Sequence, residues 1–486
     1  MWRGCRRSSS GIEGPGAKVP LTLTRPPFYS SPHMKHVIKI GGSNLKSAED
    51  LEHLRTVVGL YAEPPVIVLS AVYGVTDRLI ALIETVVEPS ANIDALLTPI
   101  LKSYTDMLEP YVTEELRSGM HEAFTENSAS LKRYLVGIQS FAVAPDFAYH
   151  FVVSFGERLS ALMVRLFFGY KGIRCLELLP ENCSMVTAGA FPHKELNFAA
   201  CSAGLQNAVT ENCLYAVPGF YAMSTDGKVT LLGRGGTDYS AAAIAYCLKA
   251  ESLDFWKDVD GFLSADPKLV PSAHLISRLS YGEAAELSYF GAKILHPRTM
   301  HPVKLGGIPA RILNIRDAVN KPGTVISSEG ERSDHGIRSV SHSLDFGILR
   351  LAGPDVGMEA GIISTVSALF NTHELNIKSI ITSQTTINFL FEKDNLARAR
   401  QLVDNLKLEA IEELECVDDI AVLALVGEGF REHPDVLARA LSALSRERIA
   451  VLLMVAGASS VSAYIVVSRN SLSTALTAVH CEFFGQ

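Results

Sequence analysis

Short apolar runs alternate with stretches of helical spacing along most of this chain. The continuous apolar segments 65–71 (PVIVLSA) and 309–314 (PARILN) are typical of strands buried on both faces of a parallel sheet. Residues 78–150 show helical spacing without recognisable chemistry, which predicts an inserted helical region. Strands that alternate with helices predict an α/β domain with a mostly parallel central sheet.

A repeated pattern follows beyond residue 344. Residues 345–391 and 419–467 share the order strand, glycine turn, helix and two strands, an internal repeat of about 70 residues. Residues 321–343, with a proline, glycines and mixed charges, predict a linker, and 309–314 is expected to be the last strand before it. The pattern therefore predicts a first domain over 34–320, a linker over 321–343 and two repeated units over 344–486.

Composition limits the classes of function. The chain has 486 residues, which is too long for a single ordinary hydrophobic core. Its formal net charge of −8 gives no reason to expect nucleic acid or an anionic membrane as partner. Eight cysteines without a C-x-x-C pair favour reduced thiols over a disulfide framework. The apolar runs are much shorter than the roughly 20 residues that a membrane span needs. We expect a soluble, cytoplasmic protein.

Residues 1–33 differ from the rest of the chain. They contain arginines, prolines and a serine run but only one acidic residue, Glu13. This composition is typical of a disordered extension, a transit peptide or an upstream misread start. Because Met34 stands directly before the first convincing strand, an extension or a misread start is favoured.

The stretch 231–242 (LLGRGGTDYSAA) is the strongest single candidate for a site. Its glycines allow backbone N–H groups to approach an anion closely, and Arg234 adds a cation. Thr237 or Asp238 is expected to cap the alanine-rich helix that follows. Taken alone, such a stretch is more often an ordinary glycine-rich connection with a capped helix.

Other candidates are weak when each is taken singly. Lys39 lies in the strand of HVIKIGGS, before a glycine turn that can present donors to phosphate. Ser70 and Thr76 follow a buried strand, where α/β proteins bind ligands. Glu157 stands in a first helical turn, where an acidic residue often only complements the helix dipole. Residues 252–268 hold several aspartates, which also favour plain turns.

Together the motifs are specific. KIGGS, SFGERLSA, VPGFYA, GRGGTDYSAA, DVDGFLSADPK and SYGEAAELSYFGAKILHPRT occur in the order found in aspartate kinases, and the chain resembles that family within the amino acid kinase superfamily. The resemblance implies a three-layer αβα fold followed by two ferredoxin-like ACT units. It also implies ATP-dependent phosphorylation of the L-aspartate β-carboxylate to 4-phospho-L-aspartate, the first step of aspartate-family amino acid biosynthesis, regulated by an amino-acid effector at the ACT units.

The resemblance assigns roles to individual positions. Lys39 would bridge the ATP phosphates and the transferring group, and Asp238 would orient Lys39 as the second catalytic residue. Arg234 would grip the substrate α-carboxylate, and Glu157 would pair with its ammonium group. The remaining substrate contacts would come from Ser70, Thr76 and Thr237. The nucleotide would be bound by Lys39, Gly41, Gly42, Ser43, Lys257, Asp258, Leu263, Lys268 and Lys293. Mg²⁺ should be held by phosphate oxygens and water, so no protein ligand is assigned.

Some positions depart from the family pattern. Lys257, Leu263 and Lys268 replace the threonine, tyrosine and arginine that are common in the nucleotide loop. A sensor with a degenerate kinase domain, or a kinase for another amino acid, is therefore the alternative function. Lys378 and Gln384 occupy positions that are acidic in lysine-inhibited relatives, so we expect lysine to inhibit weakly. ACT units also imply a homodimer or larger homo-oligomer.

Overall fold

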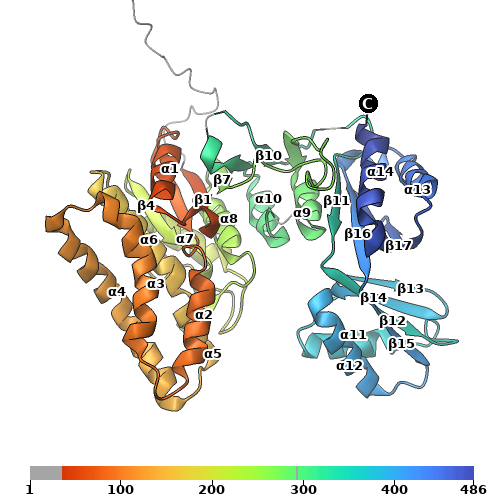
Figure 1. Cartoon of the computed structure of the whole chain (residues 1–486), viewed down its shortest axis with the longest axis horizontal. Coiled ribbons are helices and arrows are strands. Elements are labelled where there is room, and N and C mark those ends of the chain that lie inside the picture. The colour runs from red at the N-terminus through yellow and green to blue at the C-terminus, as the bar shows by residue number, and fades with distance from the viewer. Residues whose placement is uncertain (1–34, 292–293, 319, 332, 486) are drawn as a thin grey trace, which may run out of the picture. The chain divides into compact units, whose positions relative to one another are not determined.

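A large, mostly parallel sheet organises the chain up to residue 327 (Figure 1). The structure is a computed structural model that describes residues 35–291, 294–318, 320–331 and 333–485. Eight strands follow the order β3-β4-β2-β1-β7-β9-β10-β8, and β9–β10 is the antiparallel pair. Their bounds are β1 His36–Ile40, β2 Val66–Leu69, β3 Cys175–Glu177, β4 Leu214–Pro218, β7 Ser252–Lys257, β8 Arg278–Ser280, β9 Ala310–Asn314 and β10 Thr324–Ser327. The expected mostly parallel sheet is confirmed.

Helices cover both faces of this sheet. One face packs against α7 (Phe198–Ala208), α8 (Gly236–Leu248) and α10 (Met300–Gly306). The other face is covered by α1 (Ala48–Val58) and α6 (Phe155–Tyr170). These three layers are the expected αβα arrangement.

Further elements extend the layers. Four helices pack with one another beside α6 and appear as the orange group in Figure 1; they are α2 (Val75–Val86), α3 (Ile93–Leu108), α4 (Glu114–Phe141) and α5 (Asp146–Val153). The hairpin of β5 (Tyr221–Met223) and β6 (Val229–Leu231) leads into the glycine turn before α8. The helix α9 (Tyr281–Tyr289) begins with the expected capping box of Ser280 and Glu283.

Two antiparallel sheets, each with two helices, form the C-terminal region. The first has the order β13-β14-β12-β15 and the second the order β11-β16-β18-β17. The first unit contains β12 (Phe346–Ala352), α11 (Ile362–Thr372), β13 (Ser379–Thr382), β14 (Thr386–Glu392), α12 (Leu396–Leu406) and β15 (Glu413–Val417). The second contains β11 (Ser339–Ser343), β16 (Ile420–Val426), α13 (Val436–Arg446), β17 (Val451–Ala456), β18 (Ser462–Ser468) and α14 (Leu472–Phe484). Both are the expected ferredoxin-like α+β units.

The stretch 321–343 differs from the expected linker. Its β10 pairs with both β8 and β9 in the large sheet, so 309–314 is not the last strand there. Its β11 pairs with β16, so the second C-terminal unit takes a strand from before the first unit. The proline and glycines of this stretch lie outside β10 and β11. The apolar pattern of these two strands is too short to identify them without their partner strands.

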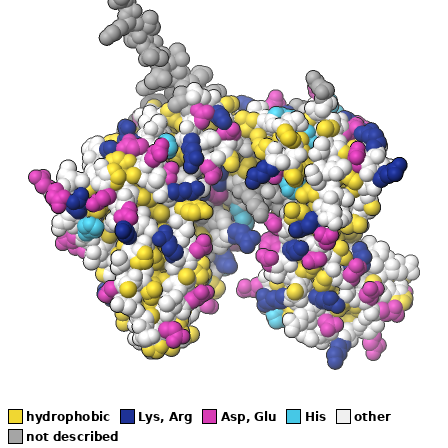
Figure 2. Space-filling view, viewed as in Figure 1, with side chains coloured by type: hydrophobic (Ala, Val, Ile, Leu, Met, Phe, Trp, Pro, Cys, Tyr) yellow, Lys and Arg dark blue, Asp and Glu magenta, His cyan; other side chains and the backbone are white. Residues whose placement is uncertain are grey.

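The described surface is mixed in charge. On the face drawn in Figure 2, acidic and basic side chains are interspersed over both the region of the large sheet and the two smaller units. Within the described residues, we find no helix that combines the length and the apolar composition needed to cross a bilayer.

Candidate active site

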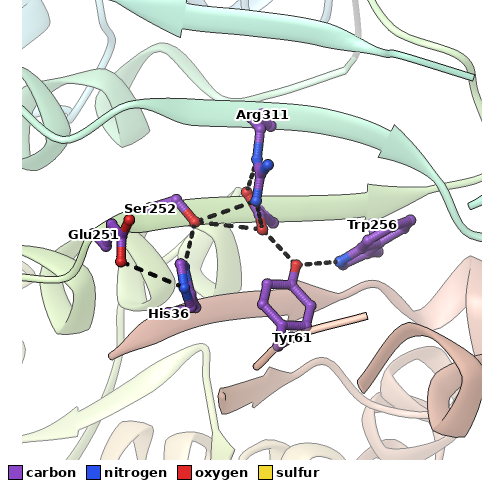
Figure 3. Close-up of polar contacts among 7 residues, drawn as sticks. His36, Tyr61, Glu251, Ser252, Trp256 and Arg311 are labelled. Carbon is purple, nitrogen blue, oxygen red and sulfur yellow. Dashed lines mark hydrogen bonds and ion pairs between the residues drawn. The ribbon is translucent and has the colours of Figure 1, made fainter. Parts of the chain in front are cut away.

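A buried polar network ties together the strands that position the site (Figure 3). Asp254 on β7 is fully buried, and the Arg311 guanidinium on β9 binds both of its oxygens, with Nε donating to Oδ1 at 2.6 Å. The Tyr61 hydroxyl also donates to Asp254 and accepts a hydrogen bond from Trp256 Nε1 at 3.1 Å. Because a buried carboxylate is costly without such partners, the network holds β7 and β9 in one register.

On β1 and β7, the alternation of side chains separates this network from Lys39 and Lys257. His36 on β1 contacts Ser252 on β7 at 3.0 Å, on the network face. Successive side chains of a strand point to opposite faces of the sheet. Lys39 follows His36, and Lys257 follows Ser252, by an odd number of residues, so both lysines project from the opposite face. That face is covered by α8, which carries Asp238. Two sequence-distant lysines are thereby directed at one carboxylate.

The glycine turn sets the start of α8. Gly235 precedes the helix with a φ of 69°, and a Cβ atom there would collide with the side chain of His296. The helix begins at Gly236 without a side-chain cap, so the expectation that Thr237 or Asp238 caps it is wrong. Both residues lie inside the first turn because the turn places the helix start earlier. The Asp238 carboxylate is consequently directed toward β1 and β7 instead of the backbone amides.

Asp238 lies between two lysine side chains. Its Oδ1 is 2.7 Å from Lys39 Nζ, and its Oδ2 is 3.4 Å from Lys257 Nζ. The side chains of Lys39 and Asp238 are less than 10% exposed, and that of Lys257 is 16% exposed. Burial opposes ionisation of Asp238, but the two ammonium groups outweigh it and lower its pKa. Burial is also the main cause that lowers the pKa of Lys257, against the attraction of Asp238.

A cavity of about 360 Å³ opens beside this cluster. It brings together many of the predicted positions, namely Lys39, Gly42, Ser43, Ser70, Thr76, Glu157, Thr237 and Asp238. The other residues that line it were not predicted; they include Ala71, Val72, Tyr73, Asp77 and Phe220. Glycine is required at Gly42, because a Cβ atom there would lie 2.6 Å from the Ala71 carbonyl oxygen.

Glu157 is one of the acidic residues that line this cavity. It lies in the first turn of α6, is 3% exposed, and its Oε2 has no hydrogen-bond partner in the described part of the chain. Burial raises the pKa of Glu157 to about 8, although the Ala71 amide and Lys39 act in the opposite direction. A buried carboxyl group with an unsatisfied oxygen is suited to receive a cationic group of a ligand.

A second cavity, of about 560 Å³, adjoins the loop that follows β7. It is lined by Asp258, Leu263 and Lys268, three of the predicted nucleotide residues. Ser339 and Ser341 of β11 also line it, so a strand of the second regulatory unit forms part of its wall. That contribution was missed because this strand lies in the stretch expected to be a linker. The predicted Lys293 lies outside the described residues.

Three predicted residues, Gly41, Arg234 and Lys257, are not part of either cavity lining in the described structure. Gly41 lies beside Lys39, and a Cβ atom built on this glycine would lie 3.3 Å from Lys39 Nζ. Arg234 is 81% exposed, and its Nη1 is 3.6 Å from Glu392 Oε2 at the end of β14. Glu392 is also 3.0 Å from Lys378 Nζ. No motif indicated this contact between the glycine turn and the first regulatory unit.

The model of the family described as "Amino acid kinase family" matches residues 34–314, more than half of the chain. The chain belongs to the amino acid kinase family. The match covers the large sheet up to β9 and includes both Lys39 and Asp238. An ACT domain model matches residues 423–483, inside the second regulatory unit.

Curated relatives and solved structures agree with this amino acid kinase assignment. A bifunctional aspartokinase/homoserine dehydrogenase of Buchnera aphidicola is 25% identical over 92% of this chain and 56% of its own length. Aspartokinase 3, chloroplastic, of Arabidopsis thaliana is 27% identical over 92% of this chain and 81% of its own. The chain thus spans little more than half the length of its bifunctional relatives.

Two solved structures share the fold. Aspartokinase III of E. coli in complex with aspartate and ADP has a TM-score of 0.77 at 23% identity, covering 93% of this chain and 100% of that one. The aspartate kinase of Clostridium acetobutylicum has a TM-score of 0.73 at 21% identity, covering 92% of this chain and 100% of that one. At these identities the likeness concerns the fold of the amino acid kinase and regulatory units.

Proposed function

We propose that this amino acid kinase phosphorylates the β-carboxylate of L-aspartate with ATP to form 4-phospho-L-aspartate. The observation that carries the proposal is the buried Lys39–Asp238 ion pair, which lies in one cavity with Glu157 and beside the loop that begins at Asp258. Relatives named aspartokinase, alignable over 92% of this chain, support aspartate as the substrate. The regulatory units support control by an amino-acid effector.

The chemistry requires charge neutralisation more than proton transfer. A β-carboxylate oxygen of aspartate attacks the γ-phosphorus of ATP, the bond to the β,γ-bridging oxygen breaks, and ADP leaves with that electron pair. The nucleophile is already an anion, so Asp238 has no proton to remove. Its role is to hold the Lys39 ammonium group at 2.7 Å, where Lys39 can offset the charge on the transferring phosphoryl group.

The cavity supports recognition of an amino-acid substrate. The unsatisfied Glu157 Oε2 would pair with the substrate ammonium group. The hydroxyl groups of Ser70, Thr76 and Thr237 line the same space and would donate hydrogen bonds to substrate oxygens. Arg234 would bind the α-carboxylate, which requires its side chain to leave Glu392.

Mg²⁺ would enter together with ATP. Asp238 already has two cationic partners, and the described residues include no group of three or more His, Cys, Asp or Glu side chains that could hold a metal ion. This donor set fits an ion that is bound mainly by phosphate oxygens and water, as Mg²⁺ commonly is. It would neutralise phosphate charge and orient the γ-phosphoryl group.

A homodimer or larger homo-oligomer is supported by the edges of the regulatory sheets. The edge strand β17 exposes Val451, Leu452 and Met454 at 38%, 47% and 39%, and the edge strand β13 exposes Ile380 at 38%. Apolar side chains on an open sheet edge favour pairing with another chain. Sedimentation that gives a monomer throughout the micromolar range would contradict this assembly.

Trapping the acyl phosphate with hydroxylamine tests the proposed reaction. The full chain is incubated with MgATP and hydroxylamine, and with aspartate, glutamate, N-acetylglutamate or no amino acid. Hydroxamate that requires aspartate supports the proposal. Product with another acceptor supports a different amino acid kinase, and no product under saturating MgATP supports a sensor without kinase activity.

A further inference from the structure

A third cavity, of about 480 Å³, adjoins the active-site cavity that contains Glu157 and Asp238. Val72 and Tyr73 line both cavities. The rest of the third cavity is formed by the start of α1 and by α2 and α3, from residues that do not line the active-site cavity. Its volume exceeds the 360 Å³ of the active-site cavity, so it has room for a ligand the size of an amino acid.

Three charged side chains line this third cavity without an ion-pair partner in the part of the chain that the structure describes. Lys46 Nζ lies 4.7 Å from the centre of the Tyr73 ring. Arg78 on α2 donates from Nη1 to Ser103 Oγ at 2.8 Å, a contact that holds its guanidinium group at the wall. Asp106 on α3 forms no hydrogen bond with the described residues. The cavity therefore presents two cations and one carboxylate.

This set of charges matches one class of small molecule. An acidic amino acid has two carboxylate groups and one ammonium group, the complement of the cavity in both number and sign. A neutral amino acid would leave one cation without a partner, and a basic amino acid would place its second ammonium group beside a cation. Val72 and Met107, which are 5% and 4% exposed, supply apolar wall for the methylene groups of such a ligand.

We propose that the third cavity is a second binding site, which takes a free acidic amino acid. The two carboxylates would bind Lys46 and Arg78, and the ammonium group would bind Asp106. The site stands apart from the proposed kinase reaction, because it needs no nucleotide and its charged residues do not line the active-site cavity. A carboxylate at Lys46 would compete with the Tyr73 ring for the ammonium group, so the ligand would act on a residue of both walls.

Saturation-transfer NMR of L-glutamate and L-aspartate with the full chain tests the site directly. Glu157→Gln serves as the background, because it removes the carboxylate that would bind an ammonium group in the active-site cavity. We expect an acidic amino acid to bind this variant at low ionic strength, and the tighter of the two identifies the source. Adding Asp106→Asn or Arg78→Gln should weaken that binding about three- to tenfold. Asp94→Asn is the matched control, since Asp94 lies on the same helix but outside the cavity.

Two probes of altered charge sharpen the test. Glutarate lacks the ammonium group and should bind at least about threefold more weakly than glutamate, and L-lysine should not compete with glutamate. Binding that is unchanged by both Asp106→Asn and Arg78→Gln, equal binding of glutarate, or no binding of either acidic amino acid in the millimolar range would overturn the second site. These measurements need no turnover, so a chain that forms no aspartyl hydroxamate would lose the proposed function and could still retain this site.

Steady-state kinetics measures the link through Tyr73. Glutamate at a fixed concentration is added to the hydroxamate assay, and the ratio of the KM for aspartate with and without glutamate is compared between variants. This ratio should differ at least about twofold between the wild type and Asp106→Asn, and Asp94→Asn should match the wild type. An equal ratio in all three would show that glutamate acts only in the active-site cavity, and would overturn the link.

Discussion

The pKa of Glu157 predicts that aspartate binding depends on pH. The Glu157 carboxyl group must be ionised to pair with the substrate ammonium group, yet burial raises its pKa to about 8 in the ligand-free protein. At pH 7 only about one molecule in eleven is then ionised, and at pH 6 about one in a hundred. The KM for aspartate should fall about tenfold for each pH unit between 6 and 7.5 and level off above 8.

Replacing Glu157 with glutamine should remove this dependence. Glu157→Gln is expected to have a high KM for aspartate that stays flat from pH 6 to 8.5. Glu177→Gln is the matched control: burial also raises the pKa of Glu177, but this residue pairs with Arg165 and lies outside the cavity lining. Burial, together with nearby Arg298 and Lys378, lowers the pKa of His296.

The same group links stability to pH in the absence of substrate. Between the ordinary pKa of 4.5 and about 8, the folded protein holds a proton that the unfolded chain has released, so wild-type stability falls as pH rises through this window. Glu157→Gln lacks this pH-dependent loss. Its free energy of unfolding at pH 8.5 should therefore exceed that of the wild type by at most about 5 kcal/mol. Urea unfolding at pH 6 and 8.5 measures the difference. A wild-type KM that is flat with pH, or an identical pH profile in Glu157→Gln, would refute the reasoning.

Three further predictions concern the catalytic cluster and its regulatory contact. Asp238→Asn should lower kcat by about 10²-fold or more with little change in the KM for aspartate, because Lys39 loses the carboxylate that holds its ammonium group. An effect on KM larger than that on kcat in steady-state assays would contradict this. Arg234→Ala should raise the KM for aspartate about 10- to 100-fold, and an unchanged KM would contradict the proposed binding of the α-carboxylate by Arg234. Glu392→Gln should lower the KM by less than about fivefold, since the Arg234–Glu392 pair is largely exposed. Lysine should inhibit weakly because Lys378 places a positive charge beside Glu392, and half-inhibition by submillimolar lysine alone would show otherwise.

Much of the candidate site was predictable because local motifs carry it. Lys39 before a glycine turn, Glu157 in a first helical turn and Asp238 after the glycine turn each have a recognisable sequence context, and their order along the chain is specific. The parallel sheet was also predictable, since continuous apolar strands require cover on both faces. The start of α8 was misjudged, because Gly235 takes a left-handed φ of 69° and itself precedes the first helical residue, and the close packing of His296 leaves no room for a side chain there.

The sequence alone determined which residues have suitable chemistry, which family they resemble and which segments form buried strands, because these properties are local or periodic. Only the tertiary structure decided which of those residues meet. Lys39 and Lys257 meet at Asp238 because β1 and β7 are neighbours in one register, while Asp254 and Arg311 tie β7 to β9 on the other face. The positions of β10 and β11 were likewise decided by partner strands far along the chain. Contacts of this kind depend on sheet order, which no single segment encodes.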